Sequence, residues 1–566
     1  MRCAYCFYNG YMKHTILALT LAASSAAAQP DSIFVNARVY TVDEAFSVAE
    51  AFAVEDGMFA AVGSEEEIRA LAADSTKVID LGGMTVLPGL IDAHGHMAGL
   101  GQLQLGTLDL AGMMSFEEVI NRVVERAETT EPGEWIIGRG WDNESWENKE
   151  LPNHHELSQA IPEHPVLLSR VDGHAALANQ RALEANDISP GTAIPNGGEM
   201  LMDDHGEPTG VFIDNAISLV RRVIPESTVS GEDLILAAQD MCLAVGLTGV
   251  HDAGVAPDMI DVYMRLESEY KLKVRVHGMI PGTRAPAWFA ENKPYHGPFF
   301  SMRSAKLFID GAMGSRGAWM LEPYKDRPFG QDGEPYVGLA LAEPGLLQAI
   351  AEDGLEKGYQ VCIHAIGDRA NREVLDLYER AASGSNLKDA RFRIEHAQLL
   401  APEDIGRFAE LGIIPSMQPT HCTSDMRWIQ DRVGPVRADG AYAWQSLLAS
   451  GVRIASGSDF PVESHNPFLG LYAAVTRQNL ESEPAGGWHP TERMSREQAL
   501  RSFTINAAYA GFNENSVGSI EVDKLADFIV IDRDYMHCSD RDIADTVVLS
   551  TWIEGTVVYQ EGHSPK

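Results

Sequence analysis

Four histidines and one aspartate in this 566-residue chain share one sequence context, since each follows a short apolar run. His94 and His96 stand two residues apart, which places both side chains on one side of an extended strand. His364, His396 and Asp459 end three further apolar runs. Neutral imidazoles and carboxylates are ligands that suit Zn²⁺ and related divalent ions. The five residues therefore predict a metal site, if one fold brings these strand ends together.

Asp459 has a second expected role. A catalytic metal site keeps one coordination position open for water, and the ion lowers the pKa of that water and polarises a substrate carbonyl. A carboxylate beside both the ion and the water can accept the proton and deliver it to a leaving amine. Each histidine taken alone is better explained as a hydrogen-bonded core residue. Four histidines that converge with Asp459 favour hydrolysis by metal-activated water.

The elements that must position these residues alternate between apolar runs and helical stretches such as 368–382 and 401–411. Eight such units closing on themselves form an α/β fold, the (β/α)8 TIM barrel, with reactive residues at the carboxyl ends of the strands. His251 also ends a run, but we interpret it as structural. The eight predicted strands are 85–91, 247–251, 274–280, 305–309, 360–364, 391–396, 413–417 and 452–456.

The two chain ends have a different sequence pattern, which is typical of β-strands without helices between them. Residues 32–41 alternate between apolar and polar side chains, which is typical of a half-buried strand, and residues 527–532 and 547–560 resemble them. We therefore predict one small β-sandwich domain built from residues 29–84 and 506–566. The predicted barrel occupies residues 85–505 between these two parts.

About 150 residues separate the first two predicted barrel strands, far more than one helix and two loops need. We expect an inserted subdomain at about residues 100–230, positioned over the barrel mouth, where additions of this kind form substrate pockets or lids.

The N-terminus carries a targeting signal. From Met12, a short charged segment is followed by the apolar stretch 15–22 and then by small residues up to Ala28. This is the pattern of a secretory signal peptide, and the apolar stretch is too short to span a bilayer. We expect translation to start at Met12, cleavage after Ala28, and export to the periplasm or the medium. The Cys-x-x-Cys pair Cys3 and Cys6 falls within this discarded leader of residues 1–28.

Acidic residues outnumber basic ones by 81 to 44, which gives a formal charge of −37. Such a surface repels phosphate backbones and anionic lipids, so nucleic acid and membrane insertion are not expected. The expected partner is a small-molecule substrate. The sequence leaves open whether the chain forms a homo-oligomer.

Several motifs together resemble the metal-dependent amidohydrolase superfamily, in the branch of the YtcJ-like proteins and N-substituted formamide deformylase. The resemblance covers nearly the whole chain after the leader. The motifs lie at residues 87–96 (LPGLIDAHGH), 138–141 (GRGW), 172–174 (DGH), 306–311 (KLFIDG), 363–370 (IHAIGDRA), 394–398 (IEHAQ), 457–461 (GSDFP), 518–521 (GSIE) and 524–527 (KLAD).

This resemblance implies roles that the residues alone do not. Lys306 matches a position where related enzymes carry a carboxylated lysine that bridges two metal ions, although an unmodified lysine paired with Asp310 or another carboxylate is the alternative. His174 matches a position near the substrate, where it could polarise a carbonyl or bind an oxyanion. A hydrogen-bonded loop histidine is the alternative there. Trp141, Arg316 and Arg369 are further candidates for lining the substrate pocket, although Arg369 could equally pair with Asp368 or Glu395.

The resemblance implies hydrolysis of a C–N bond in a non-peptide amide, a formamide or a cyclic amide, with one or two Zn²⁺ ions. Ester hydrolysis, isomerisation or decarboxylation on the same barrel are alternatives, because one fold supports many reactions. A non-enzymatic binding barrel is a third reading. It would be signalled by loss of a ligand or of the proton carrier, and all five residues are present here.

Overall fold

The computed structural model describes residues 29–226, 228–383 and 387–562. The predicted leader at residues 1–28 lies outside the described residues. Within the described ranges, no helix combines the length and the apolar character needed to cross a bilayer.

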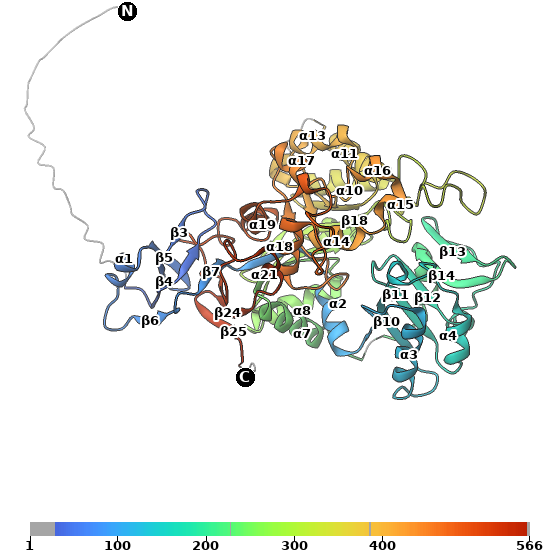
Figure 1. Ribbon diagram of the computed structural model, residues 1–566, viewed down its shortest axis with the longest axis horizontal. Coiled ribbons are helices and arrows are strands. Elements are labelled where there is room, and N and C mark those ends of the chain that lie inside the picture. The colour runs from blue at the N-terminus through green and yellow to red at the C-terminus, as the bar shows by residue number, and fades with distance from the viewer. Residues whose placement is uncertain (1–28, 227, 384–386, 563–566) are drawn as a thin grey trace, which may run out of the picture.

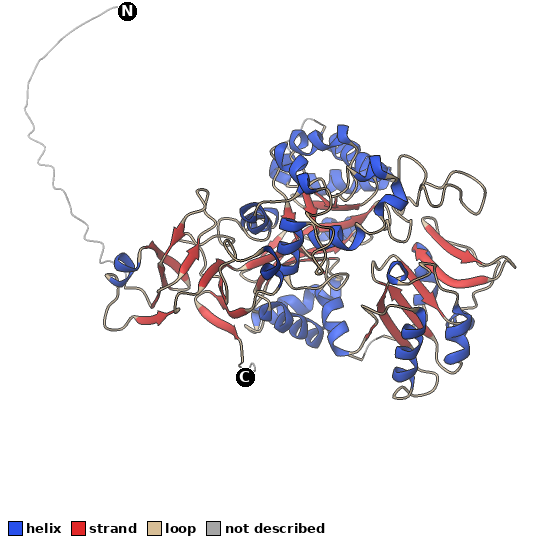
Figure 2. Ribbon diagram, viewed as in Figure 1, coloured by secondary structure: helices blue, strands red, loops and turns tan. Residues whose placement is uncertain are grey.

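Eight parallel strands form a nearly closed barrel at the centre of the molecule (Figures 1 and 2). Its ends meet where the Asp459 amide donates to the His94 carbonyl at 2.7 Å and the His96 amide donates to the Phe460 carbonyl at 2.8 Å. The fold is therefore an α/β barrel of the TIM type, as predicted. Its strands are β8 (Leu90–Gly95), β15 (Leu247–Ala253), β16 (Arg275–Pro281), β18 (Phe300–Phe308), β19 (Gln360–Ala365), β20 (Arg393–His396), β21 (Ile414–Met417) and β22 (Ala455–Ser456).

Helices between the strands cover the outside of the barrel (Figure 2). The helix α13 (Pro402–Leu411) shows how its sequence sets both ends. Proline in its first turn needs no backbone N–H partner, and Gly412 ends the helix in the left-handed region with φ 74°. The other covering helices are α7 (Gly231–Ala244), α8 (Pro257–Ser268), α10 (Pro344–Lys357), α11 (Asp368–Ala382), α17 (Trp444–Ala449) and α18 (Pro467–Thr476).

The predicted first barrel strand, residues 85–91, is in fact parts of two strands. β7 (Thr85–Pro88) pairs with β2 (Arg38–Tyr40) and β23 (Phe528–Ile531) in another sheet, and the barrel strand β8 begins only at Leu90. Residues 85–95 are buried on both sides throughout, so the apolar pattern does not reveal where one sheet ends and the next begins.

Both chain ends contribute to the same six-stranded sheet, in the order β25-β24-β23-β7-β2-β3. Four aromatic rings from the two ends pack beside it: Phe34 lies 5.0 Å from Phe528 and 5.1 Å from Trp552 between ring centroids, and 4.8 Å from Phe52. A separate four-stranded sheet has the order β5-β4-β1-β6. The remaining strands of these sheets are β1 (Ser32–Val35), β3 (Val48–Ala49), β4 (Ala51–Glu55), β5 (Met58–Gly63), β6 (Lys77–Asp80), β24 (Val548–Ile553) and β25 (Thr556–Gln560).

A fourth sheet is formed by residues between β8 and β15, on the right of Figure 1. Its order is β13-β14-β12-β11-β10-β9, and α3 (Phe116–Ala127) and α4 (His154–Ala160) pack with it. It carries His174 in the turn between two of its strands. The strands are β9 (Leu108–Asp109), β10 (Ile136–Trp141), β11 (Val166–Arg170), β12 (Ala175–Ala178), β13 (Gly198–Met202) and β14 (Pro208–Asp214).

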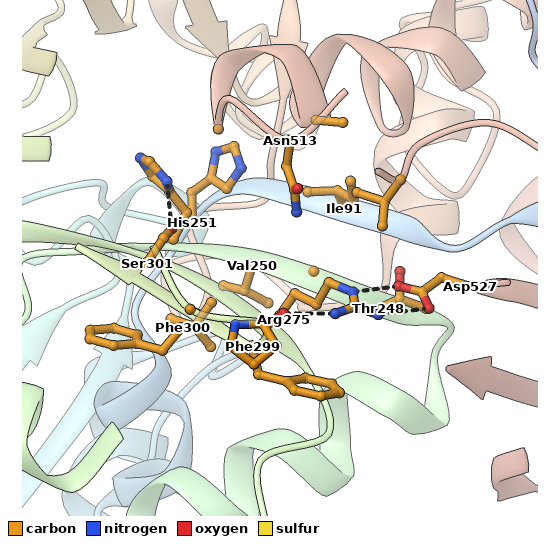
Figure 3. Close-up of a pocket in the computed structure, with 18 of the residues that line it drawn as sticks. Ile91, Thr248, Val250, His251, Arg275, Phe299, Phe300, Ser301, Asn513 and Asp527 are labelled. Atoms are coloured by element: carbon orange, nitrogen blue, oxygen red, sulfur yellow. Dashed lines mark hydrogen bonds and ion pairs between the residues drawn. The ribbon is translucent and has the colours of Figure 1, made fainter. Parts of the chain in front are cut away.

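The barrel also holds two buried histidines away from its mouth. His251 Nδ1 lies 3.0 Å from the Arg393 guanidinium, and His277 lies 3.1 Å from Ser301 Oγ and 2.7 Å from Ser304 Oγ. Figure 3 shows the small cavity of about 40 Å³ beside them, where Arg275 forms an ion pair with Asp527. We call His251 and His277 the inner histidine pair.

Candidate metal centre

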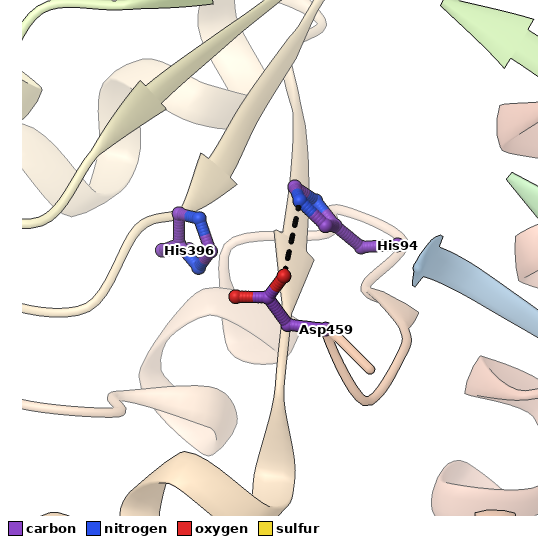
Figure 4. Close-up of side chains that lie close together, drawn as sticks. All are labelled: His94, His396 and Asp459. Carbon is purple, nitrogen blue, oxygen red and sulfur yellow. Dashed lines mark ion pairs between the residues drawn. The ribbon is translucent and has the colours of Figure 1, made fainter. Parts of the chain in front are cut away.

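Three of the predicted ligands converge at the barrel mouth (Figure 4). One ligand atom from each of His94, His396 and Asp459 lies within 4.8 Å of the other two. His94 Nε2 and Asp459 Oδ1 are 3.7 Å apart, and all three residues are buried. They come from β8, from β20 and from the segment directly after β22, so the barrel joins residues that are up to 365 positions apart in the sequence. The chemistry of this donor set fits a divalent ion.

Hydrogen bonds on the far side of two imidazoles orient them. His94 Nδ1 lies 2.5 Å from Glu395 Oε2, and His396 Nδ1 lies 2.7 Å from Gln418 Oε1. Both contacts use Nδ1, so Nε2 of each ring is the atom left to bind a metal ion, an arrangement typical of metal-binding histidines. Burial alone would raise the pKa of Glu395, but His94, Arg393 and Lys306 lower it to about 2. Glu395 is therefore an anion that holds His94 in place.

The other three predicted ligands border this group. His96 Nε2 lies 3.1 Å from Asp459 Oδ1, and Lys306 Nζ lies 3.2 Å from His94 Nε2. His364 packs against His396 with ring centroids 4.5 Å apart, while its Nε2 faces the Gly311 carbonyl at 3.4 Å. The structure thus brings all six predicted ligands to one mouth.

Lys306 does not form the ion pair with Asp310 that the alternative requires. Its side chain is buried, with 2% of the residue exposed, and it makes no ion pair within the part of the chain that the structure describes. Asp310 instead accepts backbone hydrogen bonds from Trp319, Ile366 and Gly367. Burial lowers the pKa of the Lys306 amine. This amine therefore lies in a buried site that contains no anion bonded to it.

The backbone is strained at two of the ligands. His396 and Asp459 have φ angles of 75° and 62°, in the left-handed region that side chains other than glycine rarely adopt. Asp92 supports the second of these loops, because its carboxylate accepts hydrogen bonds from the Ser458 hydroxyl at 2.6 Å and from the amides of Ser458 and His94. Strain of this kind costs about 1–3 kcal/mol per residue and is concentrated at functional sites.

His174 reaches the mouth from the inserted sheet. Its ring lies 5.1 Å from that of His364, and its Nδ1 lies 2.6 Å from Asp214 Oδ1. Burial lowers the pKa of His174, but the neighbouring Asp214 and Asp172 reverse this and leave the pKa raised. His174 is therefore held by a hydrogen bond and also faces the candidate centre. It can thus be both a hydrogen-bonded loop histidine and a residue near the substrate.

The three further pocket candidates lie elsewhere. Trp141 is 1% exposed in the core of the inserted sheet, where its indole donates to the Leu168 carbonyl, because β10 points it inward. Arg316 pairs with Asp326, and Arg369 pairs with Glu373 one helical turn further on. None of the three lines the cavity beside the metal ligands. Each of these side chains is instead bonded to a partner within the protein.

A cavity of about 200 Å³, which we call the metal cavity, opens beside the ligands and is lined by His174, His364, His396 and Asp459. It also exposes His421, which the sequence reasoning missed. The His421 ring stacks on His396 at 5.9 Å between centroids, and its Nε2 lies 3.8 Å from Asp459 Oδ2. The position of Gln418 and His421 directly after the seventh barrel strand was the available signal.

Known proteins resemble this chain over most of its length. The putative amidohydrolase YtcJ of Bacillus subtilis is 32% identical, over 92% of this chain and 98% of the relative. The N-substituted formamide deformylase of Arthrobacter pascens is 28% identical, over 94% of this chain and 98% of the relative. A solved structure of an uncharacterized metal-dependent hydrolase from Pyrococcus horikoshii aligns with a TM-score of 0.71 and 27% identity, covering 90% of this chain and 99% of that chain.

The model of the amidohydrolase family matches residues 77–559, which include the whole barrel and every predicted metal ligand. The solved structure is of a metal-dependent hydrolase, and His94, His396 and Asp459 of this chain form a group that could hold a metal ion. The chain therefore belongs to the amidohydrolase family, in the branch that contains YtcJ and N-substituted formamide deformylase, and is a hydrolase.

Proposed function

We propose that this protein is a metal-dependent amidohydrolase that hydrolyses a C–N bond in a non-peptide amide, a formamide or a cyclic amide. The observation that carries the proposal is the convergence of His94, His396 and Asp459 within 4.8 Å at the mouth of one barrel. His96, Lys306 and His364 border this group, so the donor set is large enough for one ion or two.

We propose Zn²⁺ as the ion, because imidazole and carboxylate donors suit it. When bound, it would lower the pKa of a water molecule and polarise the substrate carbonyl. Lys306 would join the ligands as a carbamate formed with CO₂, which changes a repelled cation into an anion. In support, the buried Lys306 amine lies 3.2 Å from an imidazole nitrogen of His94, with no ion pair among the described residues.

Asp459 and His174 would have separate roles, with Asp459 transferring the proton and His174 stabilising the developing negative charge. Asp459 Oδ1 faces the His94 and His96 imidazoles, so its carboxylate would accept the proton of the attacking water and pass it to the leaving nitrogen. His174 also lines the metal cavity and would donate a hydrogen bond to the carbonyl oxygen as negative charge develops there. Asp214 keeps the His174 ring in orientation, with 2.6 Å between Nδ1 and Oδ1.

The choice of C–N bonds draws support from the Arthrobacter pascens relative, which is an N-substituted formamide deformylase. A panel of matched N-substituted formamides, N-acyl amides and esters, assayed with Zn-loaded protein, tests it. We expect turnover of at least one amide class and its loss in Asp459→Asn. Turnover of the esters alone, or amide turnover that survives in Asp459→Asn, would contradict the proposal.

We also propose that the protein is exported, on the basis of the leader pattern at residues 12–28. Expression of the full chain with a C-terminal tag, followed by cell fractionation and N-terminal sequencing, checks this. Mature protein outside the cytoplasm that begins at Gln29 is the expected result, and an intact cytoplasmic protein would contradict it.

A further inference from the structure

A second, larger cavity adjoins the metal cavity at His174. This cavity, which we call the apolar chamber, has a volume of about 820 Å³, and His174 lines both spaces. Lys306, whose Nζ lies 3.2 Å from His94 Nε2, also lines the chamber. The apolar chamber therefore extends to the candidate ligands themselves, and a molecule that occupies it can reach the reactive centre.

The walls of the chamber are mainly apolar. Two of the apolar side chains, Phe308 and Leu346, are 39% and 57% exposed, although hydrophobic residues of this size are usually covered. Concave, apolar surfaces next to a reactive centre are typical of ligand subsites. Much of the apolar lining comes from β18, from the segment before α10 and from α10 itself, and includes Leu307, Phe308, Leu341, Ala342, Leu346 and Ile350.

Phe308 connects this lining to the predicted ligands. Its ring lies 5.1 Å from that of His364 between centroids, and Lys306 Nζ lies 4.4 Å from the centre of the same ring. An apolar group that packs against Phe308 would thus place its neighbouring bond beside the metal cavity. The geometry favours a substrate with its scissile bond at the ligands and a bulky substituent in the chamber.

A guanidinium group without an anion lies at the same chamber. Arg221, the last residue of α6 (Ser218–Arg221), lines it, and its contact within the described residues is to Ser169 Oγ at 3.5 Å. No ion pair of Arg221 occurs in the described ranges, whereas the nearby Arg170 pairs with both Asp142 and Asp172. Arginine is well suited to bind a carboxylate through two parallel hydrogen bonds.

The overall charge of the chain makes a local cation necessary for an anionic ligand. A formal charge of −37 disfavours the approach of anions, so a substrate carboxylate needs a specific positive partner at its binding site. Arg221 and Arg222 both line the apolar chamber and have no ion pair in the described ranges. Arg222 already donates to the side-chain and backbone oxygens of Asn186, so Arg221 is the guanidinium available to supply this charge.

We propose that the apolar chamber is a substrate subsite for a large apolar substituent that carries a carboxylate, and that Arg221 recognises this carboxylate. The inference rests on the proposed function and deepens it, since it names the substrate class as amides with an apolar, anionic substituent. His174 lies at the junction, where the substituent in the chamber meets the amide at the ligands.

Two matched N-substituted formamides test the charge preference: 4-(formamidomethyl)benzoate and its neutral analogue N-(4-methylbenzyl)formamide. In Arg221→Gln we expect the KM of the carboxylate probe to rise about 10- to 100-fold with little change in its kcat, and the KM of the neutral probe to change much less. Arg181→Gln removes an exposed arginine from the same inserted segment and is the control. Equal effects of Arg221→Gln on both probes would overturn the role of Arg221.

A substitution that fills the chamber tests its occupancy. Ala342→Trp is expected to lower the ratio of kcat/KM for N-(4-methylbenzyl)formamide to that for N-methylformamide by about tenfold or more, because the aryl group loses its space. An unchanged ratio would overturn the subsite.

Binding to the metal-free protein separates this inference from the proposed hydrolysis. We expect 4-methylbenzoate to bind wild-type protein in calorimetry and to bind Arg221→Gln and Ala342→Trp about tenfold more weakly. If no formamide is hydrolysed but this binding pattern is found, the hydrolysis of formamides fails and the subsite stands. If formamides are hydrolysed and 4-methylbenzoate binds all three proteins alike, the subsite fails and the hydrolysis stands.

Discussion

The barrel contains two groups of buried histidines that differ in what their ring nitrogens contact. In the inner histidine pair, His251 meets the Arg393 guanidinium and His277 meets two serine hydroxyls, so these imidazoles are satisfied by the protein itself. At the mouth, His94 and His396 use Nδ1 for Glu395 and Gln418, which leaves Nε2 of each ring for the group that they form with Asp459. Burial alone therefore does not identify a ligand. The orientation of the free nitrogen does.

The largest expected effect comes from Asp459, which belongs to the group at the barrel mouth and not to the inner histidine pair. We call His94, His396 and Asp459 the mouth group. Asp459→Asn keeps the shape of the side chain but removes its ability to accept a proton. We expect kcat to fall about 10²- to 10⁴-fold while bound metal is largely retained. Steady-state kinetics with elemental analysis of the same sample measures both. Near-wild-type turnover would remove Asp459 from its proposed role.

A smaller effect is expected from the residue behind His94. Glu395→Gln keeps a hydrogen-bond acceptor 2.5 Å from His94 Nδ1 but removes the negative charge. Second-sphere changes of this kind cost about 10- to 100-fold in metal affinity or activity. A competition titration with a zinc chelator checks this loss. An affinity equal to that of the wild type would show that Glu395 does not act through His94.

The inner pair should affect stability rather than metal binding. His277→Leu leaves the hydroxyls of Ser301 and Ser304 with fewer partners, which costs about 1–3 kcal/mol of folding free energy. Urea unfolding measures this change, and kcat of the folded variant should stay close to wild type. A loss of metal from His277→Leu would contradict the distinction between the two groups.

The smallest expected effect concerns pH. Burial, reinforced by Arg393, lowers the pKa values of His251 and His277 well below the ordinary 6.5, so both are neutral in the folded protein. Below about pH 6.5 the unfolded chain takes up protons that the folded protein does not, so stability falls as pH falls. In His277→Gln, the stability lost between pH 7.5 and 5.5 should shrink by about 1 kcal/mol. An undiminished loss would mean that His277 titrates normally.

Much of the barrel and of the mouth group could be predicted from local sequence. Short apolar runs that end in a polar residue mark strands whose ends face one mouth. This places His94, His364 and His396 on their strands and Asp459 directly after its strand. The split of residues 85–91 between two sheets could not be predicted, because both strands are fully buried and carry the same apolar signal.

The remaining differences arise from contacts between distant segments. Gln418 and His421 acquire their roles only when β20 and β21 lie side by side, which brings His396 next to them. Trp141 is the last residue of the motif at residues 138–141, which suggested a pocket, but its side chain faces the core of the inserted sheet. Arg369 is different, since its partner Glu373 stands four residues later on the same helix and could have been read from the sequence.

The most direct test of the account is the zinc content of three proteins prepared in parallel: wild type, His94→Ala and His277→Ala. After loading with zinc and removal of weakly bound ions, we predict at least one Zn²⁺ per chain in wild type and in His277→Ala, and its loss in His94→Ala. Retention of zinc in His94→Ala, or its loss in His277→Ala with the fold intact, would contradict the assignment of the metal centre to the barrel mouth.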